Sequence, residues 1–257
     1  MGVARVADRR GSFVSSEGAN HRGERYHSGN LEDHMTKQET PQWLTPEYWQ
    51  GRFMSSDTPW ELGHPSVVLL EAFDELARRG EDIRGKRILS PGCGTGSDAL
   101  ALAERGARVL AVDWSPSALT AIQMRAQGLS PENGSIQIES GDFFSMTPRP
   151  VDAVAEHTFF CAIDPSARGR YVDRIGEWLT TAGYLVGNFF VLSDDDASML
   201  PGLSLTPVGE GPPFATMVAE LRRLLSPTFE EILLRPATRV EPDRRPGMEW
   251  VGIFRKR

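Results

Sequence analysis

Short apolar runs alternate with amphipathic segments along most of the chain. Five runs have the length and apolar character of buried strands, at residues 87–90, 108–112, 136–139, 151–154 and 184–192. Segments whose apolar residues recur with a period near 3.6 lie before these runs, at residues 65–79, and between them, at 97–105, 115–127 and 171–179. Gly183 is expected to mark the end of the last of these helices. Strands that alternate with helices predict an α/β fold built on a mainly parallel sheet.

The C-terminal part of the chain adds a different pattern. A helical run at residues 217–225 precedes two apolar runs at 229–235 and 250–256, with a turn at 242–247 between them. Consecutive strands joined by a short connection pair antiparallel. The sequence therefore predicts a Rossmann-like, seven-stranded, mainly parallel sheet flanked by helices, with one antiparallel strand.

Residues 1–40 differ from the rest of the chain. They are rich in Arg, Ser, Gly and acidic residues and show neither helical nor strand periodicity, which predicts a disordered leader. Met35 is an alternative start of the chain. Three histidines of this stretch lack the ordered spacing of a metal site and are interpreted as part of a solvated tail: His21, His27 and His34. Residues 41–257 are then predicted to form a single domain.

Aromatic residues are unusually dense in residues 41–63, before the first sheet strand. They are Trp43, Tyr48, Trp49, Phe53 and Trp60. One interpretation is an N-terminal cap, in which a helix lies over the mouth of a ligand site and offers aromatic faces to an adenine ring or a cation. The other interpretation is ordinary packing of an N-terminal extension on the domain.

Composition narrows the choice of partners. The 257 residues carry a formal net charge of −7, which argues against nucleic acid or an anionic membrane, because both attract basic surfaces. The sequence has no apolar run near the roughly 20 residues that span a bilayer and lacks the apolar centre of a signal peptide. Two cysteines without paired spacing are typical of a cytoplasmic protein without a disulfide framework.

The segment from Arg87 to Asp113 carries the first candidate site. Its first strand ends in a turn with glycine at alternate positions, Gly92, Gly94 and Gly96, and its second strand ends at Asp113. Glycine lets a backbone approach a ligand closely, and an acidic residue about 20 positions further on accepts hydrogen bonds from ribose hydroxyls. This pattern predicts a nucleoside site, with a Rossmann-like unit of purely structural role as the alternative.

Two further segments reach the same edge of the predicted sheet. Asp142 and Phe143 follow the third strand, where a carboxylate can accept a hydrogen bond from an adenine amino group and a ring can pack on the base. The alternative is that Asp142 only forms a turn. Glu156 and His157 follow the fourth strand, over the point where the strand order reverses and ligands bind.

Six motifs together resemble one known family. They are Trp49…Phe53…Thr58-Pro59-Trp60, Pro91-Gly92-Cys93-Gly94, Val112-Asp113-Trp114-Ser115, Gly141-Asp142-Phe143-Phe144, Phe159-Phe160-Cys161-Ala162-Ile163-Asp164-Pro165 and Gly211-Pro212-Pro213-Phe214. From about Trp49 to the C-terminus, the chain resembles the thiopurine S-methyltransferase superfamily, and most closely its halide and thiol methyltransferase branch. The resemblance implies a class I fold, S-adenosylmethionine (SAM) as methyl donor and a small-molecule acceptor.

The resemblance also implies roles for single residues. Trp49, Phe53 and Trp60 are expected to line the cofactor, Gly92 to approach its methionine part, Asp113 to hold the ribose, and Asp142 with Phe143 to recognise adenine. Gly94 and His157 complete the residues that are expected to bind SAM. The loop 156–160 then borders the acceptor pocket, and Arg168 matches an Asp-Pro-x-x-Arg arginine that lies near substrate in thiopurine enzymes. Two departures leave the acceptor open. Phe53 stands where the halide branch usually has tryptophan, and Glu156-His157 replaces its common Asp-Tyr.

The chemistry of methyl transfer suggests catalytic residues. Transfer from a sulfonium is an in-line displacement, in which the protein aligns a nucleophile with the methyl carbon and excludes water; we expect no metal. A halide or hydrosulfide arrives as an anion, whereas a neutral thiol reacts as its thiolate and benefits from a proton acceptor. We predict that His157 is this acceptor and that Glu156 orients it, with a cofactor-orienting or structural role as the alternative. Cys161 is expected to be a buried core thiol.

The leading hypothesis is a cytoplasmic SAM-dependent methyltransferase that acts on a small soft nucleophile, most plausibly a thiol or hydrosulfide, with halide as a further acceptor. A second hypothesis keeps SAM but takes a larger aromatic or oxygen acceptor, shaped by the loop 194–214. A third is a non-catalytic SAM-binding sensor. The aromatic series and the acceptor-side loop favour an enzyme over this sensor.

Overall fold

A computed structural model describes residues 42–130, 132–192, 211–214, 216–239 and 247–257. Contacts group Thr40–Arg257 into one compact unit. The predicted leader, most of the loop 194–211 and most of the turn 242–247 lie outside the described residues. The division of the chain at residue 40 therefore stays a prediction.

The strands of the described part form one sheet. They are β1 (Arg87–Pro91), β2 (Arg108–Asp113), β3 (Ser135–Ser140), β4 (Val151–His157), β5 (Leu179–Leu192), β6 (Thr216–Met217), β7 (Phe229–Pro236) and β8 (Glu249–Lys256). Their order is β3-β2-β1-β4-β5-β8-β7, and the two-residue β6 pairs with β5 outside this path. In this part of the chain, β8 is the strand that runs antiparallel to both neighbours. The predicted mainly parallel sheet with one antiparallel strand is confirmed.

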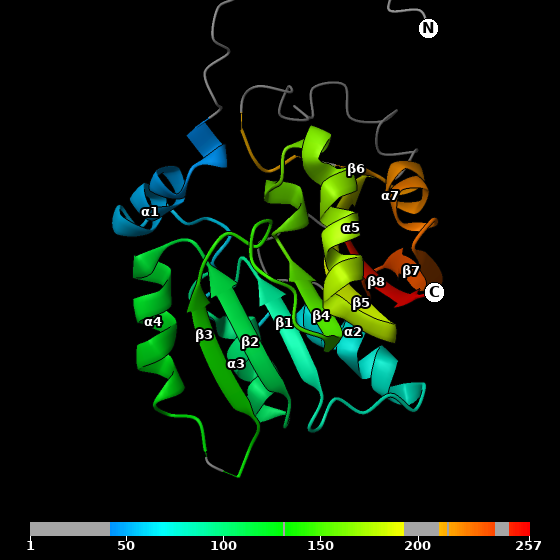
Figure 1. Ribbon diagram of the computed structural model, residues 1–257, viewed down its shortest axis with the longest axis horizontal. Coiled ribbons are helices and arrows are strands. Elements are labelled where there is room, and N and C mark those ends of the chain that lie inside the picture. The colour runs from blue at the N-terminus through cyan, green and yellow to red at the C-terminus, as the bar shows by residue number, and fades with distance from the viewer. Residues whose placement is uncertain (1–41, 131, 193–210, 215, 240–246) are drawn as a thin grey trace, which may run out of the picture. The chain divides into compact units, whose positions relative to one another are not determined.

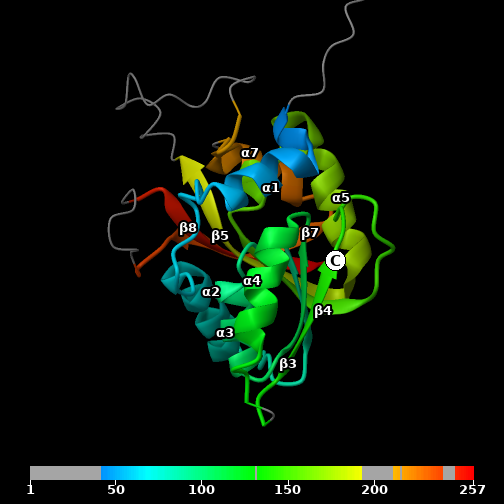
Figure 2. The same ribbon diagram turned by 90° about the vertical axis from the view of Figure 1, so that its left-hand side faces the viewer.

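Helices cover both faces of the sheet. α2 (Val67–Arg78), α3 (Ser97–Glu104) and α4 (Pro116–Ala126) lie on one face, and α5 (Arg168–Trp178) lies on the other, close to α7 (Val218–Leu225). Figure 2 shows the first three helices on one side of the strands and α5 on the opposite side. The remaining helical elements are η1 (Gln42–Leu44), α1 (Pro46–Met54), η2 (Phe160–Ala162) and η3 (Pro165–Ala167). α1 lies beyond the arrowheads of β2 and β3 (Figure 1).

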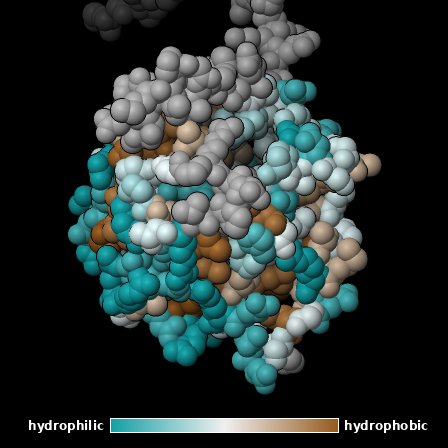
Figure 3. Space-filling view, turned by 180° about the vertical axis from the view of Figure 1, so that it is seen from behind, coloured by the Kyte–Doolittle hydropathy of each residue, from teal (hydrophilic) through white to brown (hydrophobic). Residues whose placement is uncertain are grey.

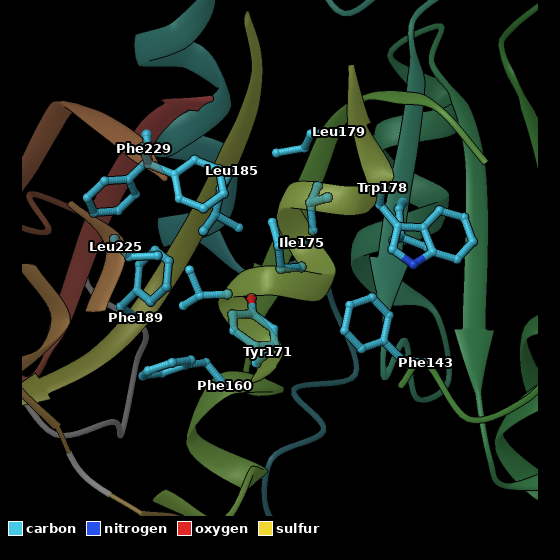
Figure 4. Close-up of a cluster of buried hydrophobic side chains, with 14 of the residues drawn as sticks. Phe143, Phe160, Tyr171, Ile175, Trp178, Leu179, Leu185, Phe189, Leu225 and Phe229 are labelled. Carbon is cyan, nitrogen blue, oxygen red and sulfur yellow. The ribbon is translucent and has the colours of Figure 1, made fainter. Parts of the chain in front are cut away.

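Apolar side chains that point alternately to the two faces of the sheet form two hydrophobic cores. In β1, Leu89 packs in the core under α5, whereas its neighbour Ile88 packs in the core under α2 and α3, because successive strand residues point to opposite faces. Figure 4 shows the first core, where Tyr171 and Trp178 of α5 pack against aromatic rings from other elements. Trp178 is fully buried, and burial of such a side chain stabilises the fold by about 1.5–3 kcal/mol.

The boundary between α5 and β5 differs from the prediction. The helical pattern was expected to include Leu179 and to end at Gly183, but α5 ends at Trp178 and Leu179 already pairs with Val151 of β4. Gly183 lies inside β5, where a Cβ would come within 3.1 Å of the carbonyl oxygen of Asp152. The glycine therefore permits close approach of two strands and does not end the helix.

The surface of the described part carries both hydrophilic and apolar residues. The face seen from behind Figure 1 carries mostly hydrophilic residues with apolar ones between them (Figure 3). No helix of the described residues is long and apolar enough to cross a membrane.

Candidate active site

The ends of six strands meet at one edge of the sheet, beneath α1. The parallel strands β1 to β5 present their carboxyl ends there, and the antiparallel β8 presents its amino end. A cavity of about 850 Å³ lies at this edge. It is lined by all nine residues that were predicted to bind SAM, which are Trp49, Phe53, Trp60, Gly92, Gly94, Asp113, Asp142, Phe143 and His157. The sequence thus predicted which residues gather at the cavity, and their individual roles stay predictions.

The glycine turn after β1 is closely enclosed. Gly92 and Gly94 have φ angles of 58° and 53°, which other residues rarely adopt. A Cβ at Gly92 would overlap the ring of Phe159, and a Cβ at Gly94 would overlap the carboxylate of Glu61. Glycine at these two positions lets Phe159 and Glu61 pack directly on the backbone of the turn, which lines the cavity.

Asp113 holds the turn in place from the tip of β2. Its Oδ2 accepts a hydrogen bond from the N–H of Gly94 at 2.9 Å, and its Oδ1 accepts one from the N–H of Ser115 at 2.8 Å. Burial raises the pKa of Asp113, although both backbone bonds act in the opposite direction. Each carboxylate oxygen has a second lone pair, which can accept from a ribose hydroxyl.

Aromatic rings enclose the cavity from two sides. On the α1 side, Trp60 meets the ring of Trp49 at 5.4 Å and that of Phe53 at 5.9 Å, both edge to face. On the β3 side, the buried Phe143 meets Phe159 at 5.5 Å. These rings leave an apolar slot that can hold a flat base and a cation.

The cap is anchored to the fold by polar contacts. Gln50 of α1 accepts a hydrogen bond from the hydroxyl of Ser115 at 2.6 Å and donates one to Ser117 at 2.8 Å. The predicted helix in the cap segment is confirmed, and these bonds fix it on the start of α4.

His157, at the end of β4, is hydrogen bonded to a residue that the sequence analysis missed. Its Nδ1 lies 2.7 Å from Oδ2 of Asp98, whose Oδ1 accepts from the backbone N–H of Ser66 at 2.7 Å. Asp98 lies in the first turn of α3, directly after the glycine turn. An acidic residue in the first turn of the helix that follows the glycine turn was the sequence signal that could have identified Asp98. No described residue is hydrogen bonded to Nε2 of His157, and His157 is among the residues that line the cavity.

Two opposing effects set the pKa of His157. Burial of the ring lowers it, but the charge and hydrogen bond of Asp98 raise it, and the charges of Glu249 and Glu156 add to this increase. The net result is a raised pKa. Burial alone would raise the pKa of Asp98, but the charge and hydrogen bond of His157, the N–H of Ser66 and the charge of His64 together lower it.

Glu156 does not line the cavity. It is 1% exposed and accepts hydrogen bonds from the N–H groups of Phe159 and Phe160 and from the hydroxyl of Tyr171, at 3.0, 2.7 and 2.6 Å. The expectation that Glu156 orients His157 by contact is wrong, because neighbouring residues of a strand point to opposite faces and Asp98 makes that bond. Glu156 instead fixes the loop after β4.

Arg168 is also buried behind the cavity, with 1% of the residue exposed. Its guanidinium donates to the carbonyl oxygen of Phe214 at 2.8 Å, to the hydroxyl of Thr216 and to Glu220 at 3.3 Å. In the structure Arg168 ties down the segment that includes the cavity-lining Pro212. Its predicted place near the acceptor stays untested.

The two cysteines are free thiols, of which Cys161 is buried and Cys93 is partly buried. Burial, and then the charge of Glu156, raises the pKa of the Cys161 thiol to about 12, and burial raises that of Cys93 as well. Both thiols are therefore poor nucleophiles near neutral pH, as expected for Cys161. Within the described residues, no three His, Cys, Asp or Glu side chains gather in a way that could hold a metal ion.

Several known proteins are similar to this chain in sequence. A profile of the family "Thiopurine S-methyltransferase" matches residues 44–251. A probable thiol methyltransferase 2 from Arabidopsis thaliana is 29% identical over 81% of this chain and 84% of its own length. A thiocyanate methyltransferase 1 from the same plant is 27% identical with the same coverage.

A solved structure supports the fold. Magnesium protoporphyrin IX methyltransferase from Synechocystis PCC 6803, with bound S-adenosylhomocysteine, superposes with a TM-score of 0.64 at 15% identity, over 83% of this chain and all of that one. The predicted class I fold and the predicted resemblance are confirmed. The chain belongs to the thiopurine S-methyltransferase family and is a SAM-dependent methyltransferase.

Proposed function

We propose that this enzyme methylates small thiols and that His157, paired with Asp98, takes the proton of the thiol. The observation that carries the proposal is the 2.7 Å contact between Nδ1 of His157 and Asp98, with the ring at the cavity wall. Because Asp98 accepts from Nδ1, the neutral imidazole carries its proton there, and Nε2 is left as a proton acceptor. This is the logic by which a carboxylate fixes a catalytic histidine.

The residues at the cavity fit SAM. The glycine turn at the cavity wall offers backbone groups, the carboxylates of Asp113 and Asp142 offer two acceptors, and the aromatic slot offers apolar faces. Asp142 uses Oδ1 to accept from the N–H of Phe144 at 2.9 Å, which leaves the second oxygen for a base. When bound, SAM supplies a methyl group on a positively charged sulfonium.

The chain's own residues then have three tasks. The aromatic walls exclude water from the reacting atoms, which strengthens the electrostatic interactions between them. The wall of the cavity positions the acceptor sulfur in line with the methyl carbon. Nε2 of His157 takes the thiol proton, and its raised pKa makes it a stronger base than a free imidazole.

The relatives support a sulfur acceptor. Two of them are named as thiol and thiocyanate methyltransferases, which favours sulfur over a larger aromatic or oxygen acceptor and over a sensor. Within this class, a neutral thiol makes use of the paired His157, whereas a free anion has no need of it. A cytoplasmic location and the absence of nucleic-acid or membrane partners remain predictions.

The variant His157→Asn tests the proposal. Asparagine keeps an N–H that can donate to Asp98 but removes the base at Nε2. We expect kcat/KM for 2-mercaptoethanol to fall about 10²- to 10⁴-fold, while kcat/KM for iodide, which needs no base, changes by less than about threefold. Release of S-adenosylhomocysteine measures both reactions. Equal losses for the thiol and for iodide would show that His157 has only a structural role.

A further inference from the structure

A carboxylate is held at the cavity wall beside His157. Asn188 of β5 and Glu249 at the start of β8 both line the cavity, and Nδ2 of Asn188 donates to Oε1 of Glu249 at 2.9 Å. Asn188 is only 4% exposed, and Nδ2 also lies 3.4 Å from the hydroxyl of Ser66. The bond is therefore partly shielded from water, and it holds the Glu249 carboxylate at the cavity wall.

The charges at this wall do not cancel. Asp98 is paired with His157 and also interacts with the charge of His64, whereas Glu249 is hydrogen bonded to the neutral amide of Asn188. Two arginines that also line the cavity have other contacts. Arg52 pairs with Asp57 at 2.8 Å and lies 4.7 Å from the ring of Trp60.

The second of these arginines lies on the opposite wall. The guanidinium of Arg170 is 4.9 Å from the ring of Phe144 and donates to its carbonyl oxygen at 3.1 Å. Behind the cavity, burial raises the pKa of Glu156, which favours its neutral form. Among the described residues, the Glu249 carboxylate next to His157 thus has a neutral hydrogen-bond partner and no ion-pair partner.

We propose that Glu249 sets the acceptor specificity of this enzyme: its carboxylate disfavours acceptors that enter as anions, such as iodide and thiocyanate, and thereby selects thiols that enter in the neutral form. This inference rests on the proposed function. The S–H proton passes to Nε2 of His157, the thiol sulfur forms a bond to the methyl carbon, and the bond from that carbon to the sulfonium sulfur breaks. The electron pair of the broken bond stays on the former sulfonium sulfur.

Glu249→Gln removes the charge with little change in shape. The amide oxygen of glutamine can still accept from Asn188, so the wall keeps its hydrogen bond. We expect kcat/KM for iodide and for thiocyanate to rise about tenfold, which corresponds to ~1.4 kcal/mol. We expect kcat/KM for 2-mercaptoethanol not to rise, because loss of the Glu249 charge also lowers the pKa of the base His157.

Glu230→Gln is the matched control. Glu230 pairs with Arg255 at 2.5 Å on the surface, with 46% of its side chain exposed, and its loss changes the net charge by the same amount. It should leave the ratio of iodide to thiol turnover as in the wild type. The same ratio in wild type, Glu249→Gln and Glu230→Gln would overturn the inference and leave the proposed function intact.

A binding measurement separates the two proposals. If the wild type binds SAM but methylates no thiol, the proposed function fails. Quenching of tryptophan fluorescence by iodide, in protein loaded with S-adenosylhomocysteine, then tests the exclusion of anions alone, because Trp49 and Trp60 line the cavity. Stronger quenching in Glu249→Gln than in Glu230→Gln would support the exclusion. Equal quenching would overturn it.

Discussion

At the scale of single residues, the proposed role of His157 as proton acceptor, with Asp98 as its partner, makes the turnover of a thiol depend on pH. The histidine must be neutral to act as a base, and its pKa is raised above the ordinary value of 6.5. Turnover of a thiol should therefore rise with pH and reach half of its maximum above pH 6.5. Iodide turnover should lack this rise.

Asp98→Asn tests the origin of that rise. Without the carboxylate, burial of the ring is opposed only by the more distant charges of Glu249 and Glu156, so the pKa of His157 should fall. The acid limb of kcat/KM for 2-mercaptoethanol should then move to lower pH, and the plateau should drop because a less basic imidazole is a weaker proton acceptor. Profiles of both proteins from pH 5 to 9, with iodide as the reference acceptor, provide the measurement. An unmoved acid limb would exclude Asp98 as the cause.

At the scale of elements, Arg168 connects the start of α5 to the chain segment that returns to the cavity. Arg168→Lys keeps the positive charge near Glu220 but loses the planar fork that serves both Phe214 and Thr216. We expect the free energy of unfolding to fall by about 1–3 kcal/mol. The KM for the thiol should rise, with kcat within about threefold, because Pro212 loses its support at the cavity wall.

A surface arginine supplies the comparison for this prediction. Arg222 pairs with Glu231 at 2.9 Å and is half exposed, so Arg222→Lys should cost less than about 1 kcal/mol. Urea unfolding and steady-state kinetics of both variants measure the two effects. A fall in kcat at unchanged KM in Arg168→Lys would instead indicate that the arginine acts on the reacting atoms, as the sequence resemblance implied.

The elements also show what a sequence can and cannot predict. The unit from Arg87 to Asp113 was predictable because a strand, its glycine turn and the next strand are contiguous and depend on local preferences. Asp98 was missed because its partner His157 lies 59 residues away in the sequence, and no periodicity encodes such a contact. The role of Gly183 was predicted wrongly for a related reason, because it depends on how closely the backbone of another strand approaches the glycine.

At the scale of the whole molecule, a ligand that binds only the folded protein must stabilise it. S-adenosylhomocysteine bridges residues from α1, β2 and the segment after β3 if the predicted roles are correct, so it should act on the folding equilibrium of the whole unit Thr40–Arg257. At 100 times its dissociation constant, it should raise the free energy of unfolding by about 2.7 kcal/mol. The urea midpoint with and without ligand gives this value.

Asp113→Ala should remove most of that stabilisation. Loss of hydrogen bonds from ribose hydroxyls to a carboxylate costs about 1.5–3 kcal/mol, which weakens binding roughly 10- to 100-fold. At the same ligand concentration, the gain in unfolding free energy should then shrink to about 0.4–1.4 kcal/mol. Each variant is compared with its own ligand-free form, since Asp113 also holds Gly94 and Ser115. Asp82→Ala, an exposed aspartate on the loop after α2, should keep the full gain, and an equal gain in Asp113→Ala would refute the ribose contact.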